Sequence, residues 1–181
     1  VIVTAVERSN FYKSLETFGT AIAQNSKTYR VKKEDIAGNL NIENRFVKKD
    51  EIIIALKNGE NIVADFQGKV GTREIAQGVL GSSSLIITLD DLKKIVIDIK
   101  VPENYVSVLK KGLKVEISNS AFNKNFNGQI DSVSSRVDPS TRSILARVIV
   151  DNSKFEIMPG QLMTVKVIYD EVEQLGVPES S

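Results

Sequence analysis

Alternating apolar and polar residues in short segments predict a mainly β protein. In residues 95–101 the order Ile-Val-Ile-Asp-Ile-Lys-Val places four branched side chains on one face of an extended strand. Similar segments rich in Val, Ile and Thr recur and are bounded by Gly, Asn, Asp or Pro. The clearest expected strands are 52–56, 85–89, 95–101, 113–118, 128–133, 144–150 and 162–169.

One segment has a helical pattern instead. Residues 103–111 follow Pro102, place Val106 and Leu109 on one face and stop at Gly112, so we expect one short helix here. Residues 107–110 match the Ser-x-x-Lys motif of penicillin-binding enzymes. The companion motifs are absent from the sequence, so we interpret the match as a solvated helix face.

A weak internal repeat predicts a small β-sandwich. Residues 38–56 and 68–89 each run from a Gly through a turn to an apolar segment. Two such halves, neither able to bury its apolar face alone, are expected to pair. Two unrelated hairpins of similar composition would give the same pattern. Asn58-Gly59 predicts a hairpin turn between the halves.

The longer strands after residue 89 predict a second module. Asp90-Asp91 is expected to form a turn, and the strands up to Tyr169 have the spacing of a small closed barrel. A strand within residues 11–23 would complete that barrel from the N-terminal side. The sandwich would then be inserted into the barrel.

Composition excludes several classes of function. The chain has 24 Lys and Arg against 23 Asp and Glu, without a basic stripe, which argues against nucleic-acid binding. It contains no Cys and no His, and so lacks disulfides, thiolate ligands and the commonest general base and metal ligand. No apolar run approaches the roughly 18 residues of a membrane-spanning helix. The abrupt ends at Val1 and Ser181 suggest cuts in a longer protein.

An ordered set of short motifs resembles the periplasmic adaptors, or membrane fusion proteins, of tripartite efflux pumps. Residues 47–56 resemble the end of the first lipoyl half of that family, and residues 64–71 the start of the second. Barrel-like motifs follow in family order at Pro102-Glu103, Leu109, Gly112, 128–130, 138–142 and 158–161. Residues 177–180 resemble the entry to the membrane-proximal domain. The ordered set of motifs as a whole is most similar to that of adaptors of resistance-nodulation-division pumps.

The resemblance implies a mainly β fold in which a lipoyl/biotinyl-like β-sandwich is inserted into a small β-barrel with one short helix. Its implied boundaries are 29–90 for the lipoyl-like domain and 9–28 with 91–169 for the barrel. Residues 1–8 and 170–181 would be parts of a membrane-proximal β domain.

The resemblance also implies a non-catalytic scaffold for export. Such a scaffold lies in the periplasm, is anchored to the inner membrane, and links an inner-membrane transporter to an outer-membrane channel. It associates into a ring when assembled and uses no cofactor, metal or nucleic acid. Family members carry a long α-helical hairpin between the lipoyl halves, whereas here only residues 57–61 join them. This chain is either a naturally short adaptor or one whose hairpin has been removed, and the abrupt ends favour removal.

The expected partner contacts fall in three places. Arg73 and Gln77 lie in the second lipoyl half, where ring contacts would fall; the alternative is solvated side chains. Phe122 and Phe126 lie in an Asn-rich turn and would anchor an interface or fold back onto the barrel. Arg142 would pair across an interface or, as we favour, with Asp138 in its own turn.

Other functions are weaker interpretations. In a lipoyl or biotin carrier, the cofactor would be attached to Lys57. The flanking Leu56 and Asn58, however, match neither the sequence pattern around the modified Lys of lipoyl carriers nor that of biotin carriers. In each of the doublets Glu34-Asp35 and Asp90-Asp91, the two neighbouring side chains would point to opposite faces of a strand. They could therefore not act as a paired acid and base on one substrate. The two methionines, with no His or Cys beside them, make a poor metal site, and Met163 is expected to pack in the core. A free-standing structural β domain is the main alternative of another class.

Overall fold

A computed structural model describes residues 7–38, 42–75, 84–120 and 125–176. The chain divides into two compact units, each treated by itself below. Unit 1 comprises residues 1–21, 96–151 and 159–181, and unit 2 comprises residues 22–95 and 152–158.

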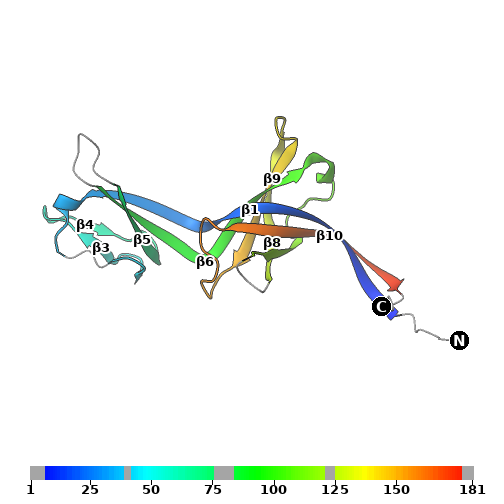
Figure 1. The fold of residues 1–181 in the computed structure, drawn as a ribbon, viewed down its shortest axis with the longest axis horizontal. Helices are drawn as coiled ribbons and strands as arrows, with labels where there is room; N and C mark the ends of the chain where they lie inside the picture. Colours follow the sequence, from blue (N-terminus) through cyan, green and yellow to red (C-terminus); the bar gives the residue numbers. More distant parts are fainter. Residues whose placement is uncertain (1–6, 39–41, 76–83, 121–124, 177–181) are drawn as a thin grey trace. The chain divides into compact units, whose positions relative to one another are not determined.

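Strands dominate both units, which confirms the prediction of a mainly β fold (Figure 1). The strands are β1 (Glu7–Lys32), β2 (Phe46–Val47), β3 (Ile52–Ala55), β4 (Asn61–Val63), β5 (Gly68–Ile75), β6 (Ser84–Pro102), β7 (Lys114–Ser118), β8 (Phe126–Asp138), β9 (Ser143–Asp151) and β10 (Leu162–Gly176). Two short 3-10 helices, η1 (Lys33–Asp35) and η2 (Glu103–Tyr105), complete the described elements.

Unit 1 is a closed barrel. Its strands follow the order β1-β10-β7-β8-β9-β6, and a further pairing of β1 with β6 closes the circle. β1 and β10 run antiparallel from the Glu7–Gly176 pair to the Thr20–Leu162 pair, with a register shift after Lys13. The prediction that an N-terminal strand completes the barrel is therefore confirmed.

Side chains of alternate residues fill the barrel. Ile97, Ile99 and Val101 on β6 are fully buried, as are Met163 and Val165 on β10. Burying such a side chain stabilises the fold by about 1.5–3 kcal/mol. The prediction that Met163 packs in the core is confirmed.

The helix expected over residues 103–111 is wrong in length. Only η2 forms, and its N–H···O bonds continue as a turn in which Leu109 donates to the Tyr105 carbonyl at 3.0 Å. The segment is too short for its hydrogen bonds to offset the free-energy cost of helix nucleation. Its β-branched residues Val106 and Val108 also have a low helix propensity. Leu109 is buried, and Gly112 ends the turn with φ +89°.

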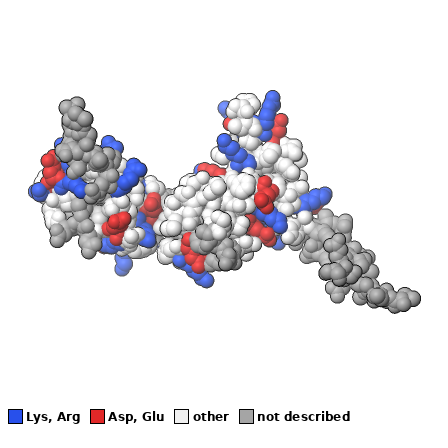
Figure 2. Space-filling view, viewed as in Figure 1, with Lys and Arg blue, Asp and Glu red and all other residues white. Residues whose placement is uncertain are grey.

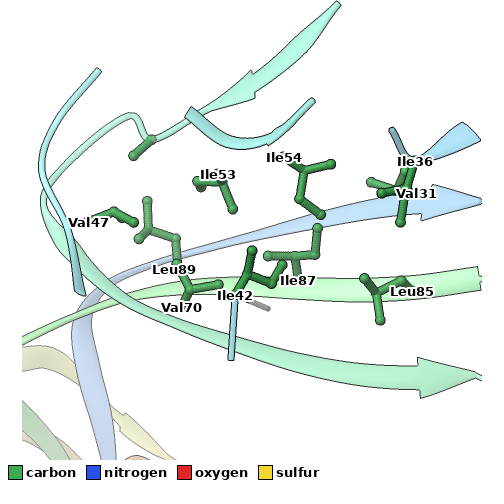
Figure 3. Close-up of a cluster of buried hydrophobic side chains, with 11 residues drawn as sticks. Val31, Ile36, Ile42, Val47, Ile53, Ile54, Val70, Leu85, Ile87 and Leu89 are labelled. Atoms are coloured by element: carbon green, nitrogen blue, oxygen red, sulfur yellow. The ribbon is translucent and has the colours of Figure 1, made fainter. Parts of the chain in front are cut away.

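Unit 2 buries one core between the two halves of the repeat (Figure 3). The first half contributes Ile53 and Ile54 from β3, and the second contributes Ile87 and Leu89 from β6. The β3–β4 pair forms its own two-stranded sheet, while β2, β5 and β6 belong to the larger sheet. The expected pairing of the halves is confirmed by this shared core.

The two predicted turns of unit 2 have different outcomes. Gly59 has φ +88° and donates its N–H to the Leu56 carbonyl at 3.0 Å, so a tight turn joins β3 to β4 as predicted. The turn predicted at Asp90-Asp91 is wrong, because β6 continues through both residues. Asp90 pairs with Lys69 of β5, and its carboxylate accepts a hydrogen bond of 2.6 Å from the Ser26 hydroxyl. These partners override the low strand propensity of Asp.

Candidate partner-binding surfaces

The loop at the tip of the β8–β9 hairpin is held by one carboxylate. Asp138 Oδ1 accepts hydrogen bonds from the Ser140 hydroxyl at 2.6 Å, the Ser140 N–H at 2.9 Å and the Thr141 N–H at 3.4 Å. The bonds from Ser140 lower the pKa of Asp138 to about 2. Pro139 fixes the backbone between them. The tip is therefore a stiff turn that projects from unit 1 (Figure 1).

The structure pairs Arg142 with Glu103, not with Asp138 as we expected. Arg142 Nη1 lies 3.9 Å from Glu103 Oε2, and the Arg142 carbonyl accepts the Glu103 N–H at 3.0 Å. Arg142 has φ +50°, a left-handed conformation that brings its carbonyl to η2. Its side chain is 74% exposed. A partner contact by Arg142 remains a prediction.

A shallow groove of about 270 Å³ lies beside this hairpin. Lys100 of β6, Arg136 of β8 and Leu145 of β9 line it, and Leu145 is 46% exposed. A register shift between Val133 and Val137 places an extra stretch of β8 against β9 at this point. Sequence reasoning missed this groove, because the bulge depends on the strand register.

A charged row crosses three strands on another part of the barrel wall. Lys166 of β10 is the register partner of Glu16 on β1 and of Glu116 on β7, with 3.7 Å between Lys166 Nζ and Glu116 Oε2. Lys166 also lies 4.7 Å from the ring centroid of Tyr12 and bonds its hydroxyl at 3.3 Å, which raises the pKa of Lys166. Period-two patterning places these residues outward but cannot align the strands, so sequence reasoning missed the row.

The other expected contact residues are scattered. Arg73 is exposed on β5, opposite Ile86 of β6. Phe126 is half-buried at the start of β8, opposite Ile117 of β7. Gln77 and Phe122 lie outside the described residues. Arg73 belongs to unit 2 and Phe126 to unit 1, and their contacts with partners remain predictions.

The β3–β4 turn of unit 2 holds Lys57. Its side chain is exposed, and its N–H donates to the Asp35 carbonyl at 2.8 Å. Elsewhere in unit 2, the Tyr29 hydroxyl donates to Asp65 Oδ2 at 2.6 Å, and Lys27 forms an ion pair with the same oxygen. Partial burial, followed by the bond to Asp65, raises the pKa of Tyr29 to about 12. This cluster ties β1 to the turn after β4.

Neither a metal centre nor a membrane helix emerges from the part of the chain that the structure describes. Within it, His, Cys, Asp and Glu side chains do not gather in groups of three or more that would suit a metal ion. Within the same residues, no helix has the length and apolar character needed to cross a bilayer. Glu34 and Asp35 are exposed on η1.

Comparison with known proteins gives a consistent result. Residues 94–171 match the family model described as the CusB-like β-barrel domain. The cobalt-zinc-cadmium resistance protein CzcB of Cupriavidus metallidurans is 26% identical over 117 residues, which are 64% of this chain and 22% of that protein. The multidrug resistance protein MdtA of Photorhabdus laumondii is 25% identical over 126 residues, covering 64% of this chain and 31% of MdtA. The chain thus spans less than a third of the length of these two relatives.

The fold has a close counterpart among solved structures. A MacA–MexA chimeric protein containing the Pseudomonas aeruginosa MexA α-hairpin domain superposes with a TM-score of 0.70 at 17% identity, covering 96% of this chain and 87% of that one. This likeness concerns the fold, and the family model and curated relatives supply the sequence evidence. On these grounds residues 94–171 are a CusB-like β-barrel domain, and the chain is similar in sequence and fold to periplasmic adaptors, or membrane fusion proteins, of the resistance-nodulation-division type.

Proposed function

We propose that the chain is the core of a periplasmic adaptor that links an inner-membrane efflux transporter to an outer-membrane channel. The observation that carries this proposal is the agreement between the closed barrel of unit 1 and the adaptor-type barrel family matched by residues 94–171. The adaptor acts as a scaffold and catalyses no reaction. It works in the periplasm, held at the inner membrane by an anchor.

In this proposal the domains have separate tasks. Residues 9–28 and 91–169 form the barrel domain, which contacts the transporter. Residues 29–90 form the lipoyl-like domain, which packs against other copies in a ring. Residues 1–8 and 170–181 belong to a membrane-proximal domain. The support comes from two separate cores, one in the barrel and one in the shared cluster of unit 2.

The turn between β3 and β4 sets a limit on this function. Only residues 56–60 connect the two strands, at the place where we expect the family to carry its α-helical hairpin. The chain therefore keeps its transporter contact and lacks the hairpin contact with the channel. Weak contacts suffice in such an assembly, because partners fixed in two membranes raise the effective concentration of the adaptor.

Genetic and biochemical measurements in the native host test the proposal. The gene that encodes this chain, called the parent gene below, is deleted from the host. The intracellular accumulation of a panel of exported dyes and metal ions is then measured. Restoring the parent gene should lower accumulation again, and the tagged parent protein should co-purify with an inner-membrane transporter. Unchanged accumulation together with no co-purifying transporter would contradict the adaptor function and favour a free-standing structural β domain.

A second comparison in the same host tests the role of the turn. Where the parent gene carries an insert between β3 and β4, an allele shortened to the turn described here should retain transporter co-purification but fail to restore export. Full export by an allele with this turn would show that channel engagement needs no hairpin.

A further inference from the structure

We propose that the groove beside the β8–β9 hairpin binds an acidic segment of the transporter that also presents one apolar side chain. The groove is defined by Lys100, Arg136 and Leu145, and is called the cationic groove below. This inference rests on the adaptor function proposed above and names the surface and the chemistry of one of its contacts.

The apolar part of the cationic groove is Leu145. β9 alternates strictly at this point, with Ile144 and Ala146 buried and Leu145 exposed between them at 46%. An exposed Leu needs no explanation by itself. Here, however, it lines a hollow of about 270 Å³, which is room for one or two side chains of a partner.

The charged part consists of two cations that lack an acidic partner. Among the described residues, neither Lys100 nor Arg136 has a carboxylate oxygen within 4.0 Å. Both are exposed and line the same hollow. Figure 2 shows both Lys or Arg and Asp or Glu side chains on the projecting hairpin of unit 1.

Two acids close to Lys100 in the sequence are already engaged. Asp98 forms two hydrogen bonds with Arg147, and Glu103 lies beside Arg142. Asp138, which also lines the groove, turns one carboxylate oxygen into its own loop. The neutral donors of that loop leave the Asp138 carboxylate charged, so the two cations and one carboxylate of the lining leave a single net positive charge. Electrostatic complementarity favours an acidic group on the partner there.

The walls of the groove are held in place before a partner arrives. The Ser134 hydroxyl bonds both the N–H and the carbonyl of Arg136, each at 3.2 Å, and so fixes the bulge. The Asp138 loop stiffens the end of the hairpin, and the Arg142 carbonyl ties it to η2. A preorganised surface loses little conformational entropy on binding.

A protein segment fits these features better than a membrane surface does. Electrostatic binding to anionic lipid needs a cluster of about four to eight basic residues. The groove offers two cations around a concave apolar centre, which suits a short peptide with a carboxylate on each side of one apolar residue. Anionic vesicles therefore serve as the competing ligand in the test.

Binding to the purified transporter is the test. The full parent protein is immobilised, and its affinity for the transporter that co-purifies with it is measured at two salt concentrations. The double variant Lys100→Glu/Arg136→Glu should weaken the affinity for the transporter at least tenfold, and the affinity should then depend less on salt. The variant Leu145→Ser should weaken the affinity several-fold. Matched controls are Lys94→Glu/Lys110→Glu and Val106→Ser, which alter exposed residues outside the groove and should change affinity less than twofold.

A photo-crosslinking side chain at position 145 identifies the occupant. The expected product joins the chain to a transporter peptide with acidic residues around an apolar one, and position 106 should not yield it. Equal affinities of the groove and control variants would overturn the inference while leaving the adaptor function intact. Crosslinks to a non-acidic peptide would also overturn it. So would displacement of the transporter by vesicles that contain anionic lipid. If the unaltered parent protein binds no transporter, both the function and the inference fail.

Discussion

Arg147 and Asp98 form a two-point ion pair across neighbouring strands of the barrel. Arg147 Nε lies 2.8 Å from Asp98 Oδ1, and Nη2 lies 3.0 Å from Oδ2. The pair joins β9 to β6 on the outer wall, one row away from Leu145. The bond to Asp98 raises the pKa of Arg147.

Replacing Arg147 with Lys should cost stability although the charge is unchanged. Lys cannot form the two parallel bonds, and a partly exposed pair of this kind contributes up to about 1 kcal/mol. A double-mutant cycle with Asp98→Asn, measured by urea unfolding, should give a coupling energy of this size that shrinks at high salt. A coupling energy of zero at low salt would show that the pair contributes nothing.

Asn152 is buried in unit 2 and its side chain forms three hydrogen bonds of 2.9 Å. The amide donates to the carbonyls of Leu92 and Ile157, and its oxygen accepts the Ile157 N–H. Asn152→Ala leaves these buried backbone groups without partners, at about 1–3 kcal/mol for each unsatisfied group. We expect the free energy of unfolding to fall by about 3 kcal/mol. Asn104→Ala, at an exposed position on η2, should change it by less than about 0.5 kcal/mol.

Gly19 is required by close packing in the barrel. A Cβ at this position would lie 2.5 Å from Ile97 Cγ2 and 2.7 Å from the Asp98 carbonyl oxygen. The backbone oxygen cannot move without breaking the sheet, so Gly19→Ala should destabilise unit 1 by about 1–3 kcal/mol. This exceeds the gain of about 0.4–1 kcal/mol from a less flexible unfolded chain. Thr20→Ala, on the exposed face beside it, is the control, and equal melting temperatures for both variants would contradict the packing.

The Asp138 loop makes stability depend on pH in the acid range. The folded-state pKa of about 2 lies below the ordinary value of 3.8, so the carboxylate stabilises the fold above about pH 4. This contribution is lost as the pH falls from 3.8 towards 2. Asp138→Ala should therefore lower the melting temperature at pH 7 but have little effect near pH 2.

Ser140→Ala provides the matched test of that mechanism. It removes the first of the hydrogen bonds that lower the pKa of Asp138, so the folded-state pKa should rise towards its ordinary value. The pH-dependent loss of stability should then be smaller and should be complete at a higher pH. A deficit in Asp138→Ala that is the same at pH 7 and pH 2 would show that the turn does not depend on the charge.

Local sequence patterns were a good guide to the strands and a poor guide to the surfaces. Residues 95–101 lie within β6 and residues 162–169 within β10, because alternation of apolar side chains is a local property. Residues 103–111 carried a helical pattern, yet they form only η2 and a turn. Propensity is a weak prior, and tertiary contacts decide the structure of short segments.

By itself, the amino-acid order determined that the chain is mainly β, that two halves share the core of unit 2, and that a tight turn joins β3 to β4. Each of these follows from the period of apolar residues and from the backbone freedom of Gly59. Only the tertiary structure decided that β6 passes straight through Asp90, that Arg142 faces Glu103, and that Lys100, Arg136 and Leu145 line one groove. The reason is that strand register and bulges bring together residues far apart in the chain, and no local pattern encodes which strand lies beside which.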